Sequence, residues 1–404
     1  MIQWENNENR IPIRSWCADA DEITLEQARN LANHPVVKDH VSLMPDAHAG
    51  YGMPIGGVIA CEGAVIPNAV GVDIGCGMGA IKTSLNAEQF TGMAHLREIV
   101  NAVKARIPVG EGKPRKEKIA WEGFDAWRGA VENPPEWFTE KGHTLDEHNL
   151  GTLGGGNHFI EIQKAENNDV WVMLHSGSRN MGQRIASHYH KAAKKLNETM
   201  GAELPDAELA YLPADCELGA DYIRDMNHAL AYALENRRLM MAHIKAILAE
   251  FFPSIAYLLE VNIHHNYAAL EEHNGNRYWI HRKGATSARE KEAGIIPGSM
   301  GTSSYIVEGL GNSASFMSCS HGAGRRLGRT KANQTLSLEE CNAAMQGVVF
   351  DRFGYSRSRT PDGKKLYDLS EAPLAYKNID AVIEAERDLV RPLVKLSPLA
   401  VVKG

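Results

Sequence analysis

The sequence predicts an α+β fold. Three runs are rich in β-branched and aromatic residues, as is typical of strands: IGGVIAC at 55–61, VWVML at 170–174 and RYWIH at 277–281. Between 221 and 252, apolar residues recur every three or four positions and Pro253 follows, which predicts one long helix. Because strands and helices do not alternate in a regular βαβ order, the pattern favours α+β over a doubly wound sheet.

Two further helices are expected, one following Asn86 and one covering IDAVIEAERDLV at 379–390. The sequence shows no repeat period and no low-complexity linker that would divide the chain. Glycine-rich segments follow several of the strand-like runs. We therefore expect loops to converge at the ends of strands.

Composition and charge limit the class of protein. The 404 residues are 44% apolar, which allows a large core, and the net charge of -7 excludes a protein that coats nucleic acid by bulk electrostatics. A polyanion would have to meet local basic patches at 113–118, 281–284 and 325–331, whose alternative interpretation is a solvated, charged surface.

The cysteine pattern and the N-terminus bear on location. Six scattered cysteines without a CxxC pair predict neither a disulfide framework nor a zinc knuckle, which favours a reducing cytoplasm. The stretch MIQWENNENRIPIRSW lacks the pattern of an export signal, and no apolar run is long enough to span a membrane.

The stretch GVDIGCGMGA at 71–80 places Asp73 and Cys76 among four glycines. Glycines allow tight turns and the close approach of a ligand to the backbone, which suits a binding site. The alternative is an ordinary turn, with Cys76 as a small buried apolar residue.

Most of the 17 histidines, such as His188 and His228, lie in helical patterns and are expected to be structural. Others are followed by small residues that would expose an imidazole at a strand end or loop. His265 ends a strand-like alternation, so one member of the His264/His265 pair is expected to point inward and the other away. Together with Asp73 and Cys76, they have the chemistry of a transition-metal site, without identifying the metal. Scattered structural histidines remain the alternative for this second group, which comprises His48, His158, His175, His265 and His321.

Three glycine-rich segments have features that cradle phosphates, namely backbone N–H groups, hydroxyls or arginine. They are GTLGGGN at 151–157, IIPGSMGTSS at 295–304 and HGAGRR at 321–326. GEGKPRK at 110–116 lacks the spacing of a Walker loop. Ordinary turns are the alternative for all of them.

Eight ordered blocks resemble the signature blocks of the RtcB family of RNA ligases: MPDAHAGYGMPIGG, GVDIGCGMG, GGGNHFIE, LHSGSR, HHNYA, HRKGA, PGSMGTSSY and HGAGR. The resemblance runs from about residue 12 to the terminal VVKG. It implies one RtcB-type ligase domain over 1–404, with mixed and antiparallel sheets, flanking helices and a central metal and nucleotide pocket.

The resemblance implies a GTP- and manganese-dependent enzyme that joins an RNA 3′-phosphate or 2′,3′-cyclic phosphate end to a 5′-hydroxyl end, in tRNA splicing or RNA repair. Cys76 would bridge two Mn(II) ions, because a metal-bound thiol is deprotonated and can serve two cations. Asp73 and His158 would complete the protein ligands of one ion, and His175 and His265 those of the other.

The same resemblance makes His321 the residue that becomes linked to GMP. A neutral imidazole is a competent nucleophile towards the α-phosphorus of GTP once the triphosphate charge is offset. The remaining residues that the resemblance assigns to guanylate binding are Asn157, His158, Phe159, Ile160, Glu161, His265, Asn266, Pro297, Gly298, Ser299, Met300, Ser304, Gly322, Ala323, Gly324 and Lys403.

Several neighbours of these residues are weighed separately. Arg179 and Arg325 each follow a candidate histidine by four residues and are placed to meet phosphates, with surface arginine as the alternative. Asp46 and His48 are expected to orient ligands, and Cys319 to be a packed thiol. His281 lies in a signature block without an assignable role.

The segment 109–137 departs from the family pattern, which leaves the RNA substrate and any accessory protein open. Two other classes of function are considered. A metal-dependent phosphodiesterase or phosphatase would use the Asp/Cys/His group without a covalent nucleotide. A non-catalytic RNA-binding or translation-associated protein would not need the metal ligands.

Overall fold

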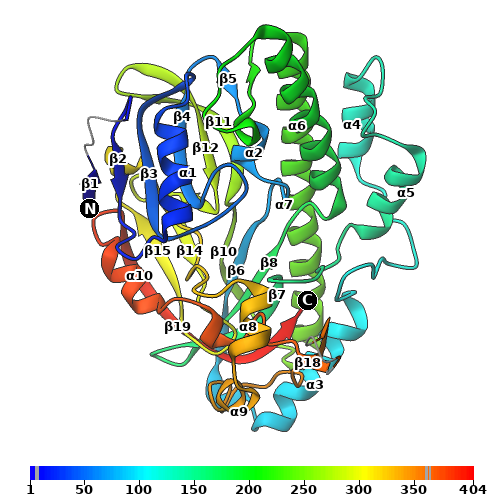
Figure 1. Ribbon diagram of the computed structural model, residues 1–404. Coiled ribbons are helices and arrows are strands. Elements are labelled where there is room, and N and C mark those ends of the chain that lie inside the picture. Colours follow the sequence, from blue (N-terminus) through cyan, green and yellow to red (C-terminus); the bar gives the residue numbers. More distant parts are fainter. Residues whose placement is uncertain (5–8, 360–362, 364) are drawn as a thin grey trace.

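The computed structural model describes residues 1–4, 9–359, 363 and 365–404, and it confirms the α+β prediction (Figure 1). Most of the described strands belong to two large sheets, one of seven strands and one of six. Residues 5–8, which are part of the N-terminal stretch in which we expected no export signal, lie outside the described residues. None of the helices in the described part of the chain has the length and apolar character needed to cross a bilayer.

The seven-stranded sheet is antiparallel throughout. Its side chains alternate between two apolar clusters: Val172 and Leu174 face one side, and Trp171 and Met173 face the other. The edge strands contact one another, so the sheet curls around the second cluster. The strand order is β10 (Tyr257–His264), β6 (Gly77–Asn86), β8 (Asp169–Ser176), β7 (Phe159–Ala165), β19 (Val390–Lys403), β15 (Ser304–Gly309) and β14 (Ala293–Ile296).

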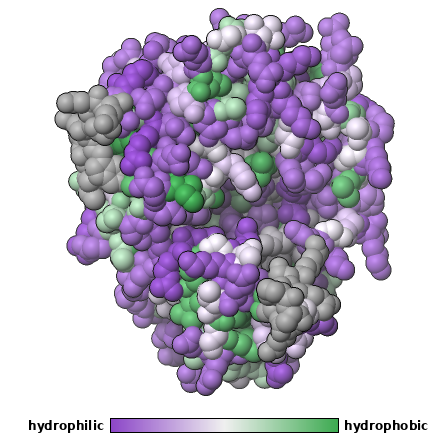
Figure 2. Space-filling view, viewed as in Figure 1, coloured by the Kyte–Doolittle hydropathy of each residue, from purple (hydrophilic) through white to green (hydrophobic). Residues whose placement is uncertain are grey.

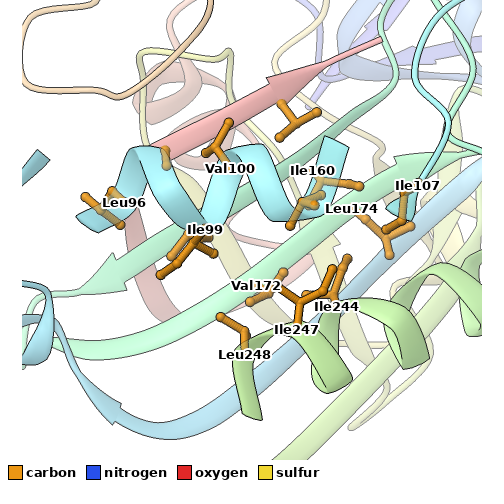
Figure 3. Packing of buried hydrophobic residues seen from close by; sticks show 14 of the residues in the cluster. Leu96, Ile99, Val100, Ile107, Ile160, Val172, Leu174, Ile244, Ile247 and Leu248 are labelled. Carbon is orange, nitrogen blue, oxygen red and sulfur yellow. The ribbon is translucent and has the colours of Figure 1, made fainter. Parts of the chain in front are cut away.

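Two helices cover the outer face of this sheet, α3 (Met93–Arg106) and the long helix α7 (Glu217–Phe251). Figure 3 shows Ile99 of α3 and Ile244 and Ile247 of α7 packed with Val172 and Leu174 of β8. Burying each such side chain contributes about 1.5–3 kcal/mol. This cluster therefore fixes the strands on which the candidate site is built.

The six-stranded sheet is mixed, because β2 and β3 are parallel and the other pairs are antiparallel. Helix α1 (Glu22–Ala32) packs against one face, where Asp21 caps its first turn through the backbone N–H of Thr24. The strand order is β1 (Ile2–Trp4), β2 (Ile13–Ser15), β3 (Val37–His48), β4 (Ile55–Cys61), β12 (Asn276–Lys283) and β11 (Asn266–His273).

The remaining described elements are short pairs of strands and surrounding helices. The pairs are β5 (Ala64–Val65) with β9 (Leu212–Pro213), β13 (Ala285–Ser287) with β16 (Ser318–Ser320), and β17 (Tyr355–Arg359) with β18 (Lys365–Tyr367). The α-helices are α2 (Pro67–Val70), α4 (Glu122–Ala130), α5 (Glu140–Asn149), α6 (Asn180–Met200), α8 (Arg329–Thr335), α9 (Leu338–Ala343) and α10 (Ile379–Ala385).

The three predicted strands are confirmed as β4, β8 and β12. The long predicted helix is also confirmed, although α7 begins four residues earlier, where the thiol of Cys216 accepts a hydrogen bond from the backbone N–H of Gly219. Its N-terminal half packs with α6 and its C-terminal half with the seven-stranded sheet, so α7 joins two apolar clusters.

One helix prediction is confirmed and one is corrected. The helix expected after Asn86 is α3, which begins at Met93, and Asn86 itself caps a short 3₁₀ turn over Ala87–Gln89. The helix expected over 379–390 ends at Ala385. Its last residue, Val390, instead begins β19 and pairs with Gly309, because this buried apolar residue gains a place in the sheet.

Candidate active site

Four strand ends meet at one end of the seven-stranded sheet. In its antiparallel register, Gly77 at the start of β6 pairs with Ser176 at the end of β8 and with His264 at the end of β10. Phe159 at the start of β7 pairs with His175. The candidate ligands beside these positions are therefore neighbours, although they are far apart in the sequence.

The five residues expected to bind metal lie in contact with one another. The Cys76 thiol lies 3.5 Å from Nε2 of His158 and 3.2 Å from Nε2 of His175. Asp73 Oδ2 lies 3.3 Å from Nε2 of His158, and His265 Nε2 lies 3.3 Å from Nε2 of His175. Cys76 thus stands between two pairs of potential ligands.

The imidazoles of His158 and His175 are held in one orientation. Nδ1 of His158 donates to the carbonyl oxygen of Leu153 at 3.0 Å, and Nδ1 of His175 donates to that of Asn157 at 3.1 Å. Because a carbonyl can only accept, Nδ1 of each ring carries a hydrogen, and Nε2 is the ring atom that faces Cys76. Burial also lowers the pKa of His175 and His265 well below the usual range, which keeps these two imidazoles neutral.

The glycine-rich loop allows this approach. Gly75 has a φ of +76°, a conformation that L side chains rarely adopt, and a Cβ at Gly77 would meet the carbonyl oxygen of Ile263 at 2.0 Å. Behind the loop, the buried guanidinium of Arg237 donates to the carbonyl oxygens of Gly75 and Ser176. Cys76 is indeed buried, but its sulfur faces imidazole nitrogens, and this donor set fits a transition metal.

His321 lies next to this group, directly after β16. Its ring centroid is 4.9 Å from that of His265, and its Nδ1 lies 2.6 Å from Oδ2 of Asp46, a buried residue of β3. The same carboxylate oxygen accepts a hydrogen bond from the backbone N–H of His321. Asp46 therefore fixes the ring and directs Nε2 away from β3. This contact agrees with the orienting role that the sequence predicted for Asp46.

A cavity of about 150 Å³ opens beside His321. Figure 2 shows that hydrophilic residues cover most of one face of the molecule and that a hollow crosses its middle. His48 lines the cavity, as does Lys403, which the register of β19 places opposite Phe159. The other predicted site residues that line it are Asn157, Phe159, His175, Pro297, Gly298, Ser299, Met300, His321, Gly322, Ala323 and Gly324. A larger hollow of about 1160 Å³ adjoins this cavity through Tyr376 and contains none of the candidate ligands.

Six residues assigned to guanylate binding do not line this cavity, and two of them, His158 and His265, belong to the candidate metal-ligand group. The side chain of Ile160 points into the apolar cluster under α3 and α7 (Figure 3). Asn266 donates to the carbonyl oxygen of Asp73 and so supports the metal-side loop. Glu161 and Ser304 both contact the side-chain amide of Gln163, and Ser304 also accepts from the backbone N–H of Gly298. These two residues reach the cavity only through their neighbours.

Sequence analysis missed a carboxylate in the cavity wall. Glu371 lies 3.1 Å from Nη1 of Arg325, 3.2 Å from Nε of Arg329 and 3.3 Å from Nζ of Lys403, and it accepts a hydrogen bond from the hydroxyl of Tyr376. No motif spacing links these positions, because they come from separate parts of the fold: Arg329 begins α8 and Lys403 ends β19. Three cations around one carboxylate leave the cavity positively charged.

Glu371 gives a prediction for the pH dependence of stability. Although burial opposes ionisation, Lys403, Arg325 and Arg329 lower the pKa of Glu371 from 4.5 to about 2. The ion pairs therefore stabilise the fold fully above pH 4.5, by about 3 kcal/mol, and this contribution is lost as the pH falls towards 2. In urea unfolding, wild type should have a higher free energy of unfolding than Glu371→Gln above pH 4.5. This difference should shrink as the pH falls from 4.5 towards 2. A difference that does not vary with pH would contradict this assignment.

Comparison with known proteins shows the family to which the chain belongs. A family model described as tRNA-splicing ligase RtcB matches residues 27–404. The chain belongs to the RtcB family. It is 40% identical over 414 residues to the RNA-splicing ligase RtcB of Escherichia coli K12, with 97% of each chain covered. It is 31% identical over 481 residues to the tRNA-splicing ligase RtcB of Thermococcus kodakarensis, covering 100% of this chain and 98% of the relative. The second alignment is longer than this RtcB-family chain, so that relative carries insertions.

One basic patch of this RtcB-family chain is corrected. The residues of HRKG at 281–284 are buried, and they form neither a solvated surface nor a patch for a polyanion. Arg282 pairs with Glu271, and the ammonium group of Lys283 donates to the carbonyl oxygens of Tyr51 and Asn68. The ring of His281 accepts from the backbone N–H of Ile66, which gives this histidine a structural role that the sequence did not assign.

Other residues of the RtcB-family blocks lie as expected or close to the site. Cys319 is fully buried in an apolar cluster, which confirms the packed thiol. Nη1 of Arg179 lies 3.4 Å from Nδ1 of His158, and Arg179 has a φ of +59°, unusual for a residue other than glycine. Arg325 lines the cavity, whereas the segment at 113–118 is largely exposed.

Proposed function

We propose that this chain is a GTP- and manganese-dependent RNA ligase that joins a 3′-phosphate or 2′,3′-cyclic phosphate end to a 5′-hydroxyl end. The observation that carries the proposal is the position of His321, held by Asp46, between the five-residue metal-ligand group and a positively charged cavity. Relatives named as RNA-splicing and tRNA-splicing ligases support the RNA substrate. The family match over most of the chain supports one ligase domain over 1–404.

Cys76 would hold metal ions together with the four ligands around it. Asp73 and His158 would hold one ion with Cys76, and His175 and His265 would hold the other. Bound there, Mn(II) would act as a Lewis acid and offset the negative charge of the phosphates. Without a metal, burial keeps the pKa of the Cys76 thiol well above its usual value, so binding would release a proton.

The reaction begins on His321. The lone pair of Nε2 attacks the α-phosphorus of GTP, a P–N bond forms, and pyrophosphate leaves. Because Nδ1 faces the Asp46 carboxylate, the positive charge that develops on the imidazole is stabilised as in a catalytic triad. Arg325, Arg329 and Lys403 surround the cavity and would bind the triphosphate.

Two transfers to RNA complete the reaction. An oxygen of the RNA 3′-phosphate attacks the guanylate phosphorus, and the P–N bond to His321 breaks. The 5′-hydroxyl then attacks the RNA phosphorus, which forms the phosphodiester and releases GMP. The energy of the GTP anhydride bond drives the ligation. A role in tRNA splicing or RNA repair and a cytoplasmic location complete the proposal, and the six free thiols support that location.

The test is covalent labelling. Wild-type protein mixed with Mn(II) and α-phosphate-labelled GTP should retain label after denaturation, and the label should be acid-labile and alkali-stable, as a phosphoramidate is. His321→Ala should retain none, whereas Cys319→Ala, which removes a packed thiol two residues away, should label like wild type. The absence of label on wild type with any divalent metal would refute the ligase mechanism and favour the metal-dependent phosphodiesterase or phosphatase.

A further inference from the structure

A second cavity, of about 180 Å³, lies between α4, α5, the start of α6 and α7. In Figure 1, α4 and α5 stand beside α6 and α7 at one edge of the molecule. None of the candidate metal ligands lines this cavity. Its walls are mainly aromatic: Phe124, Trp127, Trp137, Phe138, His143 and His228.

A single buried carboxylate fixes these walls. Asp225 of α7 accepts hydrogen bonds from Nε1 of Trp127 at 2.9 Å, from Nε1 of Trp137 at 2.7 Å and from the hydroxyl of Tyr189 at 2.6 Å. Both indole rings are therefore held in place without a ligand. Because the walls are already ordered, the binding of a ligand costs little additional conformational entropy.

The rings offer flat faces next to an opening. Trp127 stacks on His228 with an interplanar angle of 24° and lies at 30° to Phe138. Phe138 and His143 are only half-buried, so they stand at the mouth. The guanidinium of Arg128 lies 4.6 Å above the Phe138 ring and pairs with Glu140 at 2.9 Å.

The cavity also holds an acceptor without a donor. The side chain of Asp146 is 3% exposed, and its Oδ2 accepts from Arg184. Its Oδ1 is buried and has no hydrogen-bond partner among the described residues. Leaving a buried polar atom without a hydrogen bond costs about 1–3 kcal/mol of stability. An N–H donor on a bound ligand would remove this cost by bonding to the oxygen.

The cavity adjoins the candidate active site through two short connections. Helix α5 leads directly to Leu153, whose carbonyl oxygen orients His158. Met181, which lines the cavity, lies two residues after Arg179. Short segments of the chain therefore join the walls of this cavity to the candidate active site.

We propose that this cavity binds one unstacked base of the RNA substrate, with the ring between aromatic faces and an amino or imino N–H donated to Asp146. The inference rests on the proposed RNA ligase function. Aromatic stacking with hydrogen bonds to base edges is how proteins recognise single-stranded RNA. It also gives the divergent segment 109–137, which contributes α4 and Trp137, a part in substrate choice.

The experiment measures the affinity of fluorescently labelled single-stranded RNA that ends in a 3′-phosphate. In a series of probes, each nucleotide in turn is replaced by an abasic residue. Wild type should lose roughly 5- to 150-fold in affinity at one position, the effect of one lost stack. Phe138→Ala and Asp146→Asn should bind intact RNA more weakly and should no longer respond to the abasic position. Tyr355→Ala, which removes an exposed aromatic ring outside the cavity, should behave as wild type.

Two results would overturn the proposal. One is an affinity of wild type that is the same for every abasic probe. This result would overturn the proposal even if the cavity bound free nucleosides. The other is an unchanged abasic profile in both cavity variants. Labelling of His321 with GMP needs no RNA, so it reports separately whether each variant is folded and whether the proposed ligase function holds.

Discussion

If the proposed function holds, Cys76→Ala is expected to abolish RNA ligation, with a loss on the order of 10³-fold or more, because it removes the side chain that lies against both His158 and His175. The remaining imidazoles and Asp73 would form two incomplete sites. The metal content of the purified variant, measured by elemental analysis after incubation with Mn(II), should fall with the activity. Labelling by GTP should fail as well, since the triphosphate charge would no longer be offset.

Cys319→Ala is the matched control for this prediction. Both thiols are buried, and Cys319 lies two residues before a signature block, but its sulfur packs in an apolar cluster and donates to the carbonyl oxygen of Ser320. We expect Cys319→Ala to keep its metal and its activity. A Cys76→Ala variant that retains full manganese and ligates at the wild-type rate would show that the sulfur is not a ligand.

The sequence predicted which residues gather at the site but not the geometry that gathers them. Cys76, His158, His175 and His265 are separated by long stretches, and no local spacing predicts their contact. The register of an antiparallel sheet supplies it, because the start of one strand lies beside the end of the next. The same register explains why Lys403, at the far end of the chain, lies beside Phe159.

The failures have local physical causes. Charge alone predicted a surface for HRKG, yet a guanidinium can be buried when a carboxylate and several acceptors surround it. The helix expected over 379–390 ended early because long-range pairing of Val390 prevailed over local propensity. Glu371 was missed because a single carboxylate in a loop carries no periodic or motif signal, and only the fold brings three cations to it.

Glu271→Ala is expected to lower the free energy of unfolding by about 3–5 kcal/mol, the largest stability effect that the described ion pairs suggest. Arg282 is fully buried, and its Nη1 and Nη2 lie 2.5 and 3.2 Å from the two carboxylate oxygens of Glu271. Its remaining donors bond the hydroxyl of Tyr267, the hydroxyl of Ser318 at the start of β16 and the carbonyl oxygen of Phe316. Removing Glu271 would leave this guanidinium buried without its counter-charge.

The double variant Glu271→Leu with Arg282→Met distinguishes the cost of a stranded charge from a simple loss of packing. Replacing both ions by apolar side chains removes their desolvation penalty together with their attraction, so the double variant should recover most of the stability in urea unfolding. Glu308→Ala, which breaks the exposed pair with Arg391, should cost no more than about 1 kcal/mol. If the double variant were as unstable as Glu271→Ala, the pair would contribute through packing and specific hydrogen bonds. The ion pair would then be required to hold β16, and with it His321, against the six-stranded sheet.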